Sequence, residues 1–304
     1  MKRYVYMFSI LTGAMLLSGC GDDDNEAAET EGNPDEIVMG FVPTTDSDEI
    51  ASTVEPLAER LSEILDRPVE GTVMTSFSAL VEAMGNGQAH IGFLPAFGYV
   101  QGNEEYGIEV MLKSERDGAD SYRAQYVVRA DSGLETLEDL EGTQWTFPDV
   151  ASPAGYLFPA AHIGEEIDGV QDAETEFFSG VLEAGSHDNA LIAVMEGEMD
   201  VATTYEDARE VMLDDYPDAM EDLTVIDYTD DIPNDTISIM PELDEGLADD
   251  IKEAFLQFNE EEEMIQIMND VYRWDAIVEA EDSDYDIVRE TYEAFRDEID
   301  VDDL

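Results

Sequence analysis

Short apolar runs alternate with amphipathic helical segments along the chain from Glu36 onward, and this order restricts the possible folds to few. Runs of strand length lie at 36–43, 68–74 and 90–94. Between the first two, apolar residues from Ile50 to Leu65 recur at spacings of three and four, which predicts one helix. Such alternation is typical of a parallel sheet flanked by helices, so the sequence predicts the α/β class.

The same rhythm continues toward the C-terminus. Further strands are predicted at 122–130, 144–147, 176–178, 199–203 and 236–240. Further helices are predicted after Ser76 or Ser78, at 134–140, from Tyr156, from Ser186 to Met195, and over the remainder after 240.

The N-terminus has the pattern of an export signal. Two basic residues precede an apolar stretch at 5–17 that is too short to span a bilayer comfortably. It ends in Leu17-Ser18-Gly19-Cys20, which resembles the bacterial lipobox, whose cysteine receives diacylglycerol. We therefore expect a signal peptide at 1–19, lipidation at Cys20 and an acidic tether at 20–35, although an ordinary secretory signal with a chance cysteine is the alternative. Cys20 is the only cysteine, which excludes disulfides and cysteine-based metal sites.

The charge of the chain is extreme, with 76 Asp and Glu against 13 Lys and Arg. A hydrophobic fraction of 43% with regular amphipathic segments argues against a disordered acidic protein. A cationic partner and adaptation to high salt both remain open, and the even spread of acids along the chain favours a salt-exposed, halophilic surface. So negative a chain lacks the basic face that nucleic-acid binding requires.

Turns rich in small hydroxyl residues separate several predicted strands from the helices that follow, at 43–48, 75–78, 151–155 and 185–188. One such turn alone would be ordinary helix capping. In open α/β sheets, however, the carboxyl ends of the strands share one edge, where ligands bind. Several helix N-termini that converge there would form an anion site that needs few basic side chains.

Four segments carry a resemblance to a known family. Gly185-Ser186-His187-Asp188, with the small-residue helix and the strand up to Tyr205 that follow, resembles the phosphonate/phosphite/phosphate-binding proteins of ABC importers. Segments 79–100, 149–159 and 232–235 resemble further parts of the same family pattern. They occur in the family order and cover most of the chain after the tether.

The resemblance implies a two-lobed periplasmic-binding-protein type II fold, each lobe a mostly parallel sheet flanked by helices. Lobe I would comprise 36–125 and 235–304, and lobe II would comprise 126–234. Two hinge strands would cross between the lobes, near 126–129 and 235–240.

It also implies roles for single residues. Ser152 and the N–H groups around Gly155 would hold phosphoryl oxygens, and His187 would donate to another. The Tyr122 hydroxyl would reach the ligand, with packing as the alternative. Asp235, with Asp207 or Glu206, would accept hydrogen bonds from an ammonium, a hydroxyl or a protonated phosphorus oxygen. The full implied ligand-binding set is Thr44, Thr45, Phe77, Tyr122, Ser152, Ala154, Gly155, His187, Asp207 and Asp235.

The chain departs from the family pattern in two places. Ser152-Pro153-Ala154 stands where the family often has Ser-Thr-Ser, so two hydroxyls are lost and Pro153 also lacks an N–H. Phe77 stands where phosphonate binders tend to carry a tyrosine. Both changes favour phosphite, phosphate or methylphosphonate over aminoalkylphosphonates.

The predicted function is therefore a lipid-anchored, extracytoplasmic and monomeric substrate-binding component, without cofactor or metal, that closes on its ligand and docks on an ABC permease. A ligand-sensing lipoprotein for a signalling receptor is one alternative. A surface phosphoester hydrolase is another, but the chain lacks G-x-S-x-G and H-E-x-x-H, and its only histidines are His90, His162 and His187. Carboxylate-only metal sites stay open, and no ATP-binding P-loop is present.

Overall fold

The computed structural model describes residues 32–44, 47–116 and 118–295. The predicted signal peptide, Cys20, most of the tether and Thr45 lie outside this part of the chain. Within it, every helix is too short or too polar to cross a bilayer.

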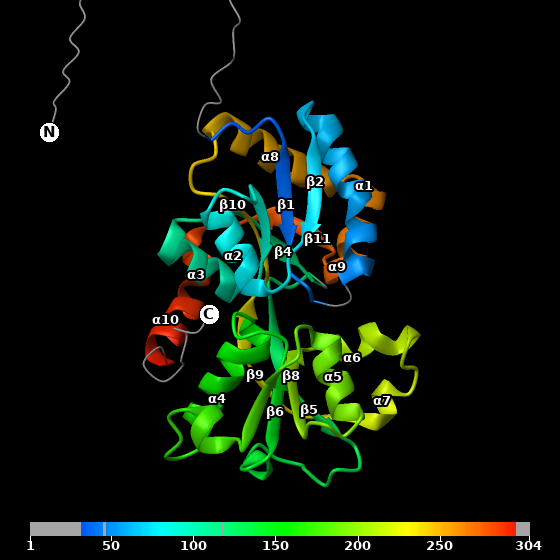
Figure 1. Cartoon of the computed structure of the whole chain (residues 1–304), viewed down its shortest axis with the longest axis vertical. Helices are drawn as coiled ribbons and strands as arrows, with labels where there is room; N and C mark the ends of the chain where they lie inside the picture. The colour runs from blue at the N-terminus through cyan, green and yellow to red at the C-terminus, as the bar shows by residue number, and fades with distance from the viewer. Residues whose placement is uncertain (1–31, 45–46, 117, 296–304) are drawn as a thin grey trace, which may run out of the picture.

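Figure 1 shows two lobes along the long axis of the molecule, each with one sheet and helices packed against it. The first sheet has the strand order β11-β4-β10-β3-β1-β2. Its strands are β1 Ile37–Phe41, β2 Val69–Val73, β3 Ile91–Leu94, β4 Glu109–Glu115, β10 Thr236–Ile239 and β11 Ala276–Glu279. The second sheet has the order β7-β6-β8-β5-β9. Its strands are β5 Ser121–Arg129, β6 Gln144–Phe147, β7 Gly180–Glu183, β8 Val201–Tyr205 and β9 Leu223–Pro233.

Both sheets are mixed, whereas the sequence predicts mostly parallel ones. β1 pairs in parallel with β2 and β3, and β6 pairs in parallel with β7 and β8. β10 and β5 run antiparallel to both of their neighbours. Each of these two strands receives the chain directly from the other lobe, so it enters its sheet from the opposite end. Hydrophobic periodicity carries no information about that direction.

Helices of the first lobe come from both ends of the chain. They are α1 Ser47–Leu65, α2 Phe77–Gly85, α3 Ala96–Tyr106, α8 Glu245–Phe258, α9 Glu262–Tyr272, the turn η5 Asp282–Tyr285 and α10 Asp286–Phe295. Those of the second lobe are η1 Glu138–Leu140, η2 Pro153–Leu157, α4 Phe158–Glu166, η3 Ala173–Phe177, α5 His187–Met195, α6 Ala208–Val211, η4 Met212–Asp214 and α7 Ala219–Asp222. α10 packs against both α3 and α4 and so contacts both lobes.

The chain passes between the lobes twice, between β4 and β5 and between β9 and β10. Asn234 joins the two passages, because its buried side-chain amide donates to the carbonyls of Ser114, at 3.0 Å, and Ala119, at 2.8 Å. The expected lobe boundary after Gln125 falls inside β5, which belongs entirely to the second sheet.

Several local predictions differ from the structure. α3 and β4 have no counterpart among the predicted elements, and β11 lies in the region after 240 for which the sequence predicts helix. Residues 134–140 form only the short turn η1, and the strand predicted at 176–178 is the end of η3 instead, with β7 beginning two residues later.

Candidate functional site

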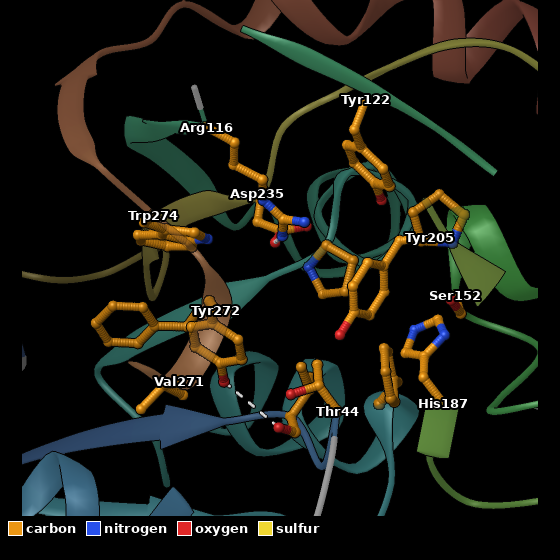
Figure 2. Close-up of a pocket in the computed structure, with 15 residues that line it drawn as sticks. Thr44, Arg116, Tyr122, Ser152, His187, Tyr205, Asp235, Val271, Tyr272 and Trp274 are labelled. Carbon is orange, nitrogen blue, oxygen red and sulfur yellow. Dashed lines mark hydrogen bonds and ion pairs between the residues drawn. The ribbon is translucent and has the colours of Figure 1, made fainter. Parts of the chain in front are cut away.

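A cavity of about 30 Å³ lies between the lobes, at the edge where strands of both sheets end. The first lobe contributes residues after β1 and β3, the start of α2 and the end of α9. The second contributes the starts of η2 and α5 and the end of β8, and Figure 2 shows these side chains pointing toward one another. Arg116 and Asp235 come from the two inter-lobe passages.

An ion pair forms one wall of the cavity. The Arg116 Nη2 atom donates to Asp235 Oδ2 at 2.7 Å, and the two side chains are 17% and 15% exposed. Burial raises the pKa of the Asp235 carboxyl, and Arg116 opposes that rise. Burial disfavours the charge of Arg116, but Asp235 together with Tyr122 and Tyr205 opposes this effect and leaves the pKa of the guanidinium raised. The cavity wall therefore carries one positive charge, that of Arg116, which the Asp235 carboxylate compensates.

Aromatic rings surround this guanidinium. Its Cζ atom lies 5.0 Å from the ring centroid of Tyr122 and 5.6 Å from that of Tyr205. Burial raises the pKa of both phenols, to about 12 for Tyr205, so both are neutral hydroxyls at ordinary pH. The indole nitrogen of Trp274 faces Asp235 in Figure 2 and helps to lower the pKa of that carboxyl.

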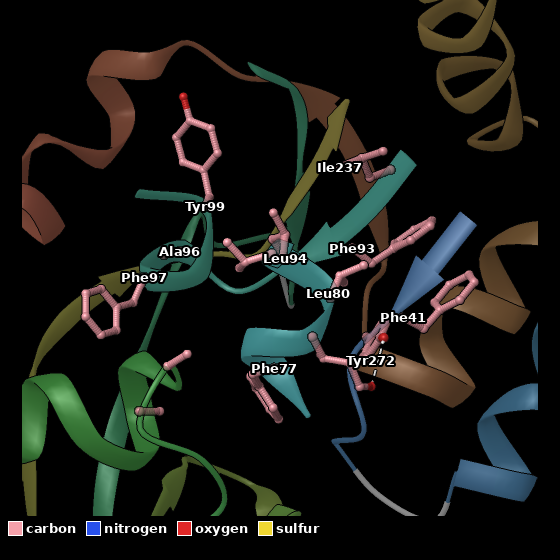
Figure 3. Close-up of a cluster of buried hydrophobic side chains, with 14 of the residues drawn as sticks. Phe41, Phe77, Leu80, Phe93, Leu94, Ala96, Phe97, Tyr99, Ile237 and Tyr272 are labelled. Carbon is pink, nitrogen blue, oxygen red and sulfur yellow. Dashed lines mark hydrogen bonds between the residues drawn. The ribbon is translucent and has the colours of Figure 1, made fainter. Parts of the chain in front are cut away.

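The cavity floor is part of the hydrophobic core of the first lobe. Phe93 stacks on Phe41 with ring centroids 4.4 Å apart and on Tyr272 at 6.3 Å, and Figure 3 shows these rings beside Leu80. The Tyr272 hydroxyl donates to the carbonyl of Val42 at 3.4 Å. This packing holds the floor rigidly beneath the polar walls.

The helix starts behave as capped N-termini. Ser76, Ser152 and Ser186 are the N-cap residues of α2, η2 and α5, and each side chain accepts a hydrogen bond from a backbone N–H of the first turn. At η2 that donor is Gly155, at 3.0 Å. A Cβ atom at Gly155 would lie 2.5 Å from the Pro148 ring, which explains why the turn carries glycine.

Two hydrogen bonds join the lobes beside the cavity. The backbone N–H of Phe77 donates to Asp149 Oδ2 at 2.9 Å, and the N–H of His187 donates to the Thr44 carbonyl at 3.1 Å. Both donors are first residues of helices, so protein oxygens already use part of the expected anion-binding N–H groups. Asp149 is 2% exposed, and burial raises the pKa of its carboxyl although two backbone donors oppose this.

Four polar atoms on the cavity walls are buried without a hydrogen-bond partner among the described residues: Thr44 Oγ1, Arg116 Nε, His187 Nδ1 and Trp274 Nε1. Burial, with a smaller contribution from Arg116, lowers the pKa of His187 to about 3. The imidazole is therefore neutral at pH 7. Each unsatisfied buried group costs about 1–3 kcal/mol, so four of them around one cavity indicate that a polar ligand completes the site.

The structure brings together six of the implied ligand-binding residues, namely Thr44, Phe77, Tyr122, Ser152, His187 and Asp235. Ala154 and Gly155 are buried behind the cavity wall, which Pro153 lines instead. Glu206 pairs with Arg123 at 3.0 Å and does not line this cavity. Asp207 does not line it either, and is the N-cap residue of α6 with a φ of 70°. The neighbouring position, Tyr205, is the one that faces the ligand space.

Arg116, Tyr205, Tyr272 and Trp274 line the cavity and are absent from the set that the sequence implies. An arginine is conspicuous in a chain with 13 basic residues, but Arg116 lies in no motif. Among the described residues, no cluster of His, Cys, Asp and Glu has the arrangement of a metal site.

Comparison with known proteins gives concordant matches. A family model for the periplasmic substrate-binding protein of phosphonate ABC transporters matches residues 39–285. A phosphate-import protein of Mycolicibacterium smegmatis is 27% identical over 225 residues, which cover 71% of this chain and 66%, just under two thirds, of that protein. The phosphonates-binding periplasmic protein of Escherichia coli is 22% identical over 260 residues, covering 84% and 72% respectively.

A solved structure has the same fold. A Prochlorococcus marinus protein in complex with methylphosphonate matches with a TM-score of 0.76 at 19% identity, covering 87% of this chain and 99% of that one. At this identity the likeness concerns the fold, and it confirms the predicted two-lobed architecture.

Proposed function

Because the chain belongs to the family of periplasmic substrate-binding proteins of phosphonate ABC transporters, we propose that it captures a small phosphorus oxyanion and delivers it to an import permease. Members of this family are binding proteins, not enzymes. The observation that carries the proposal is the cavity between the lobes, which contains one arginine and four unpaired polar atoms on walls from both lobes.

Each of these groups suits a tetrahedral oxyanion. Arg116 supplies charge-assisted donors, while the Thr44 hydroxyl and the neutral His187 imidazole supply donors without further charge. Asp235 would accept a hydrogen bond from a protonated phosphorus oxygen and would repel a fully ionised one. The set therefore favours an anion that retains a proton.

The size of the cavity narrows the ligand class. A volume of about 30 Å³ between Phe77, Pro153 and the tyrosines suits a compact anion. Phosphite, phosphate and methylphosphonate fit this description, and aminoalkylphosphonates do not. The loss of two hydroxyls at Ser152-Pro153-Ala154 agrees with the same ranking.

Capture would proceed by closure of the lobes about the two passages at 116–121 and 233–236. Ligand contacts come from both lobes, so only the closed form makes all of them at once. The hydrogen bonds from Phe77 to Asp149 and from His187 to Thr44 would form on closure and add to its stability. Of the described residues, we assign those from 36 to about 120 and 234–295 to lobe I, and the stretch between them to lobe II.

Isothermal titration of the protein from Gly21 onward tests this function, in molar salt to screen the repulsion of its carboxylates. We expect one of phosphite, phosphate and methylphosphonate to bind with micromolar or tighter affinity. His187→Ala should weaken that binding at least about tenfold because it removes a donor from a buried anion. His162→Ala is the matched control, since His162 lies in α4 outside the cavity, and it should leave the affinity unchanged. Absence of heat with all three anions, in protein shown to be folded, would refute the proposal.

We also propose that the protein is a monomer tethered to the outer face of the cell membrane through lipid on Cys20, and that its acidic surface is adapted to high salt. Partition of the protein between a detergent phase and an aqueous phase tests for the lipid anchor. The wild type should enter the detergent phase and Cys20→Ser the aqueous phase, because the thiol is the only atom that can carry the thioether. Retention of Cys20→Ser in detergent would contradict lipidation at this residue.

A further inference from the structure

A second cavity, of about 140 Å³, lies directly beside the first. α1 and α9 of the first lobe and α5, α6 and η4 of the second line it, so it also belongs to the inter-lobe cleft. The two cavities share three residues, His187, Tyr205 and Val271. We refer to the smaller cavity, with Arg116 and Asp235, as the anion chamber and to the larger one as the outer chamber.

Tyr205 is the large side chain of that shared wall. Its ring contacts the His187 ring edge to face, with centroids 4.7 Å apart. The Arg116 Cζ atom lies 5.6 Å from the centroid of the same tyrosine ring. In Figure 2 the ring lies between the Arg116–Asp235 pair and His187. The residue ends β8, whose backbone is paired with β5 at Ala124, so the strand fixes the position of the ring's attachment.

The outer chamber differs in chemistry from the anion chamber. Four carboxylates line it, those of Asp188, Asp214, Asp215 and Asp270. One oxygen of Asp188 accepts a hydrogen bond from the Ser186 hydroxyl. Apolar side chains such as Ile50 and Met212 complete the walls. A cationic or apolar group would be accepted in such surroundings, whereas a second anion would be repelled.

We propose that Tyr205 is a specificity-determining residue whose ring closes the anion chamber against the outer chamber and so excludes phosphonates with substituents longer than methyl. Removal of the ring would join the chambers into one site, in which the substituent enters the outer chamber and an ammonium group is preferred. This inference rests on the proposed function, because it presupposes that the head group binds beside Arg116.

Titration of Tyr205→Ala with a series of phosphonates tests the inference. The probes are methylphosphonate, n-propylphosphonate, 2-aminoethylphosphonate and 3-phosphonopropionate, which differ in the length or charge of the substituent. We expect methylphosphonate to bind within about tenfold of its wild-type affinity and 2-aminoethylphosphonate to gain at least about tenfold over wild type. The gain should be smaller for the propyl compound and absent for the carboxylate.

Two further tyrosine variants separate the ring from other effects. Tyr205→Phe keeps the ring and should exclude long substituents as the wild type does. Tyr216→Ala is the matched control, because Tyr216 lines only the outer chamber, so its loss enlarges that chamber without opening the wall. Tyr205→Thr, which suits a strand end, provides a second truncation whose thermal unfolding is compared with that of the wild type.

The outcomes distinguish this inference from the function on which it rests. If wild-type protein binds methylphosphonate but neither truncation gains the longer ligands, the role of Tyr205 is overturned and the proposed function stands. A gain in Tyr205→Phe or Tyr216→Ala equal to that in Tyr205→Ala also overturns it. If the wild type binds no phosphorus anion, the proposed function and this inference fail together.

Discussion

Replacement of Arg116 by methionine should reduce the affinity for the phosphorus oxyanion by at least about a hundredfold, the largest single-residue loss that we expect. Methionine keeps the unbranched stem of the side chain but removes its guanidinium, and with it the charge and all of the donors. Asp235 would then remain in the cavity without its partner at 2.7 Å, so the ligand would meet an uncompensated carboxylate. The affinity is measured by titration, and chemical unfolding of the same variant shows how much of the change is due to stability.

The chain offers a matched control for this experiment. Arg123 also pairs with a carboxylate, that of Glu206 at 3.0 Å, and also lies over a tyrosine ring, that of Tyr228 at 4.2 Å. It lines neither cavity, and its side chain is 42% exposed. Arg123→Met should change the affinity by less than about threefold, as exposed pairs contribute little. Equal affinities of folded Arg116→Met and wild type would show that the ligand does not bind beside the guanidinium.

The place of Arg116 in the site cannot be predicted from the sequence, for a physical reason. Its partner, Asp235, is distant in the chain, and the two meet only because both inter-lobe passages run side by side. β4, the strand that leads to Arg116, was itself not predicted. The hydroxyl-rich turns predict an anion site made by helix N-termini, but in the fold two of those N–H groups bind Asp149 and Thr44.

Local patterns succeeded where the structure is decided by neighbours in the chain. The stripe from Ile50 to Leu65 falls within α1, and the predicted caps Ser76 and Ser186 start α2 and α5. These features depend on spacings of three or four residues, which sequence displays directly.

Elements that depend on tertiary contacts were missed. α3 contains Gly98 and Gly102, which lower its helix propensity, and at Gly102 a Cβ atom would lie 2.6 Å from the Ile108 side chain. β11 has only four residues and exists because it pairs with β4 at the sheet edge. Close packing in the first case and strand pairing in the second therefore override the local signal.

The choice between Tyr205, Glu206 and Asp207 shows the same limit at the site. Along a strand, adjacent side chains point to opposite faces, so an error of one residue exchanges the ligand-facing side for the outer side. The family resemblance implies an acid at 206 or 207, whereas Tyr205, the last residue of β8, lines the cavity and Glu206, which follows it, pairs with Arg123. Only the register of β8 against β5 resolves this, with Tyr205 opposite Ala124.

Asp235→Asn should change which anion the protein prefers. In the wild type, the Asp235 carboxylate can accept a hydrogen bond from a protonated oxygen of phosphate, phosphite or methylphosphonate, but sulfate carries no proton to donate at neutral pH. Asparagine keeps the shape, replaces repulsion with an amide donor and leaves Arg116 free to bind the anion. We expect the ratio of phosphate affinity to sulfate affinity to fall by at least about a hundredfold, measured by titration of both anions at pH 7.

Asp149→Asn serves as the control for this variant. Asp149 is also a buried carboxylate, and it accepts hydrogen bonds from the backbone N–H groups of Phe77 and Ala151. Its replacement should weaken closure of the lobes and lower both affinities together, leaving their ratio unchanged. An unchanged ratio in Asp235→Asn as well would mean that Asp235 does not face the ligand's protonated oxygen.

The dependence on pH separates the charge of Asp235 from its shape. Burial raises the pKa of this carboxyl, so it gains a proton at a higher pH than an exposed aspartate does. Once protonated it can donate, and sulfate affinity of the wild type should therefore rise as the pH falls through that pKa. His187, whose pKa is about 3, gains charge at still lower pH in wild type and variant alike, so it does not alter the comparison.

Sulfate binding by Asp235→Asn should lack the rise that the wild type shows near the pKa of Asp235, because an amide has no proton to gain in this range. If both proteins show the same rise, a group other than Asp235 controls the selectivity against sulfate.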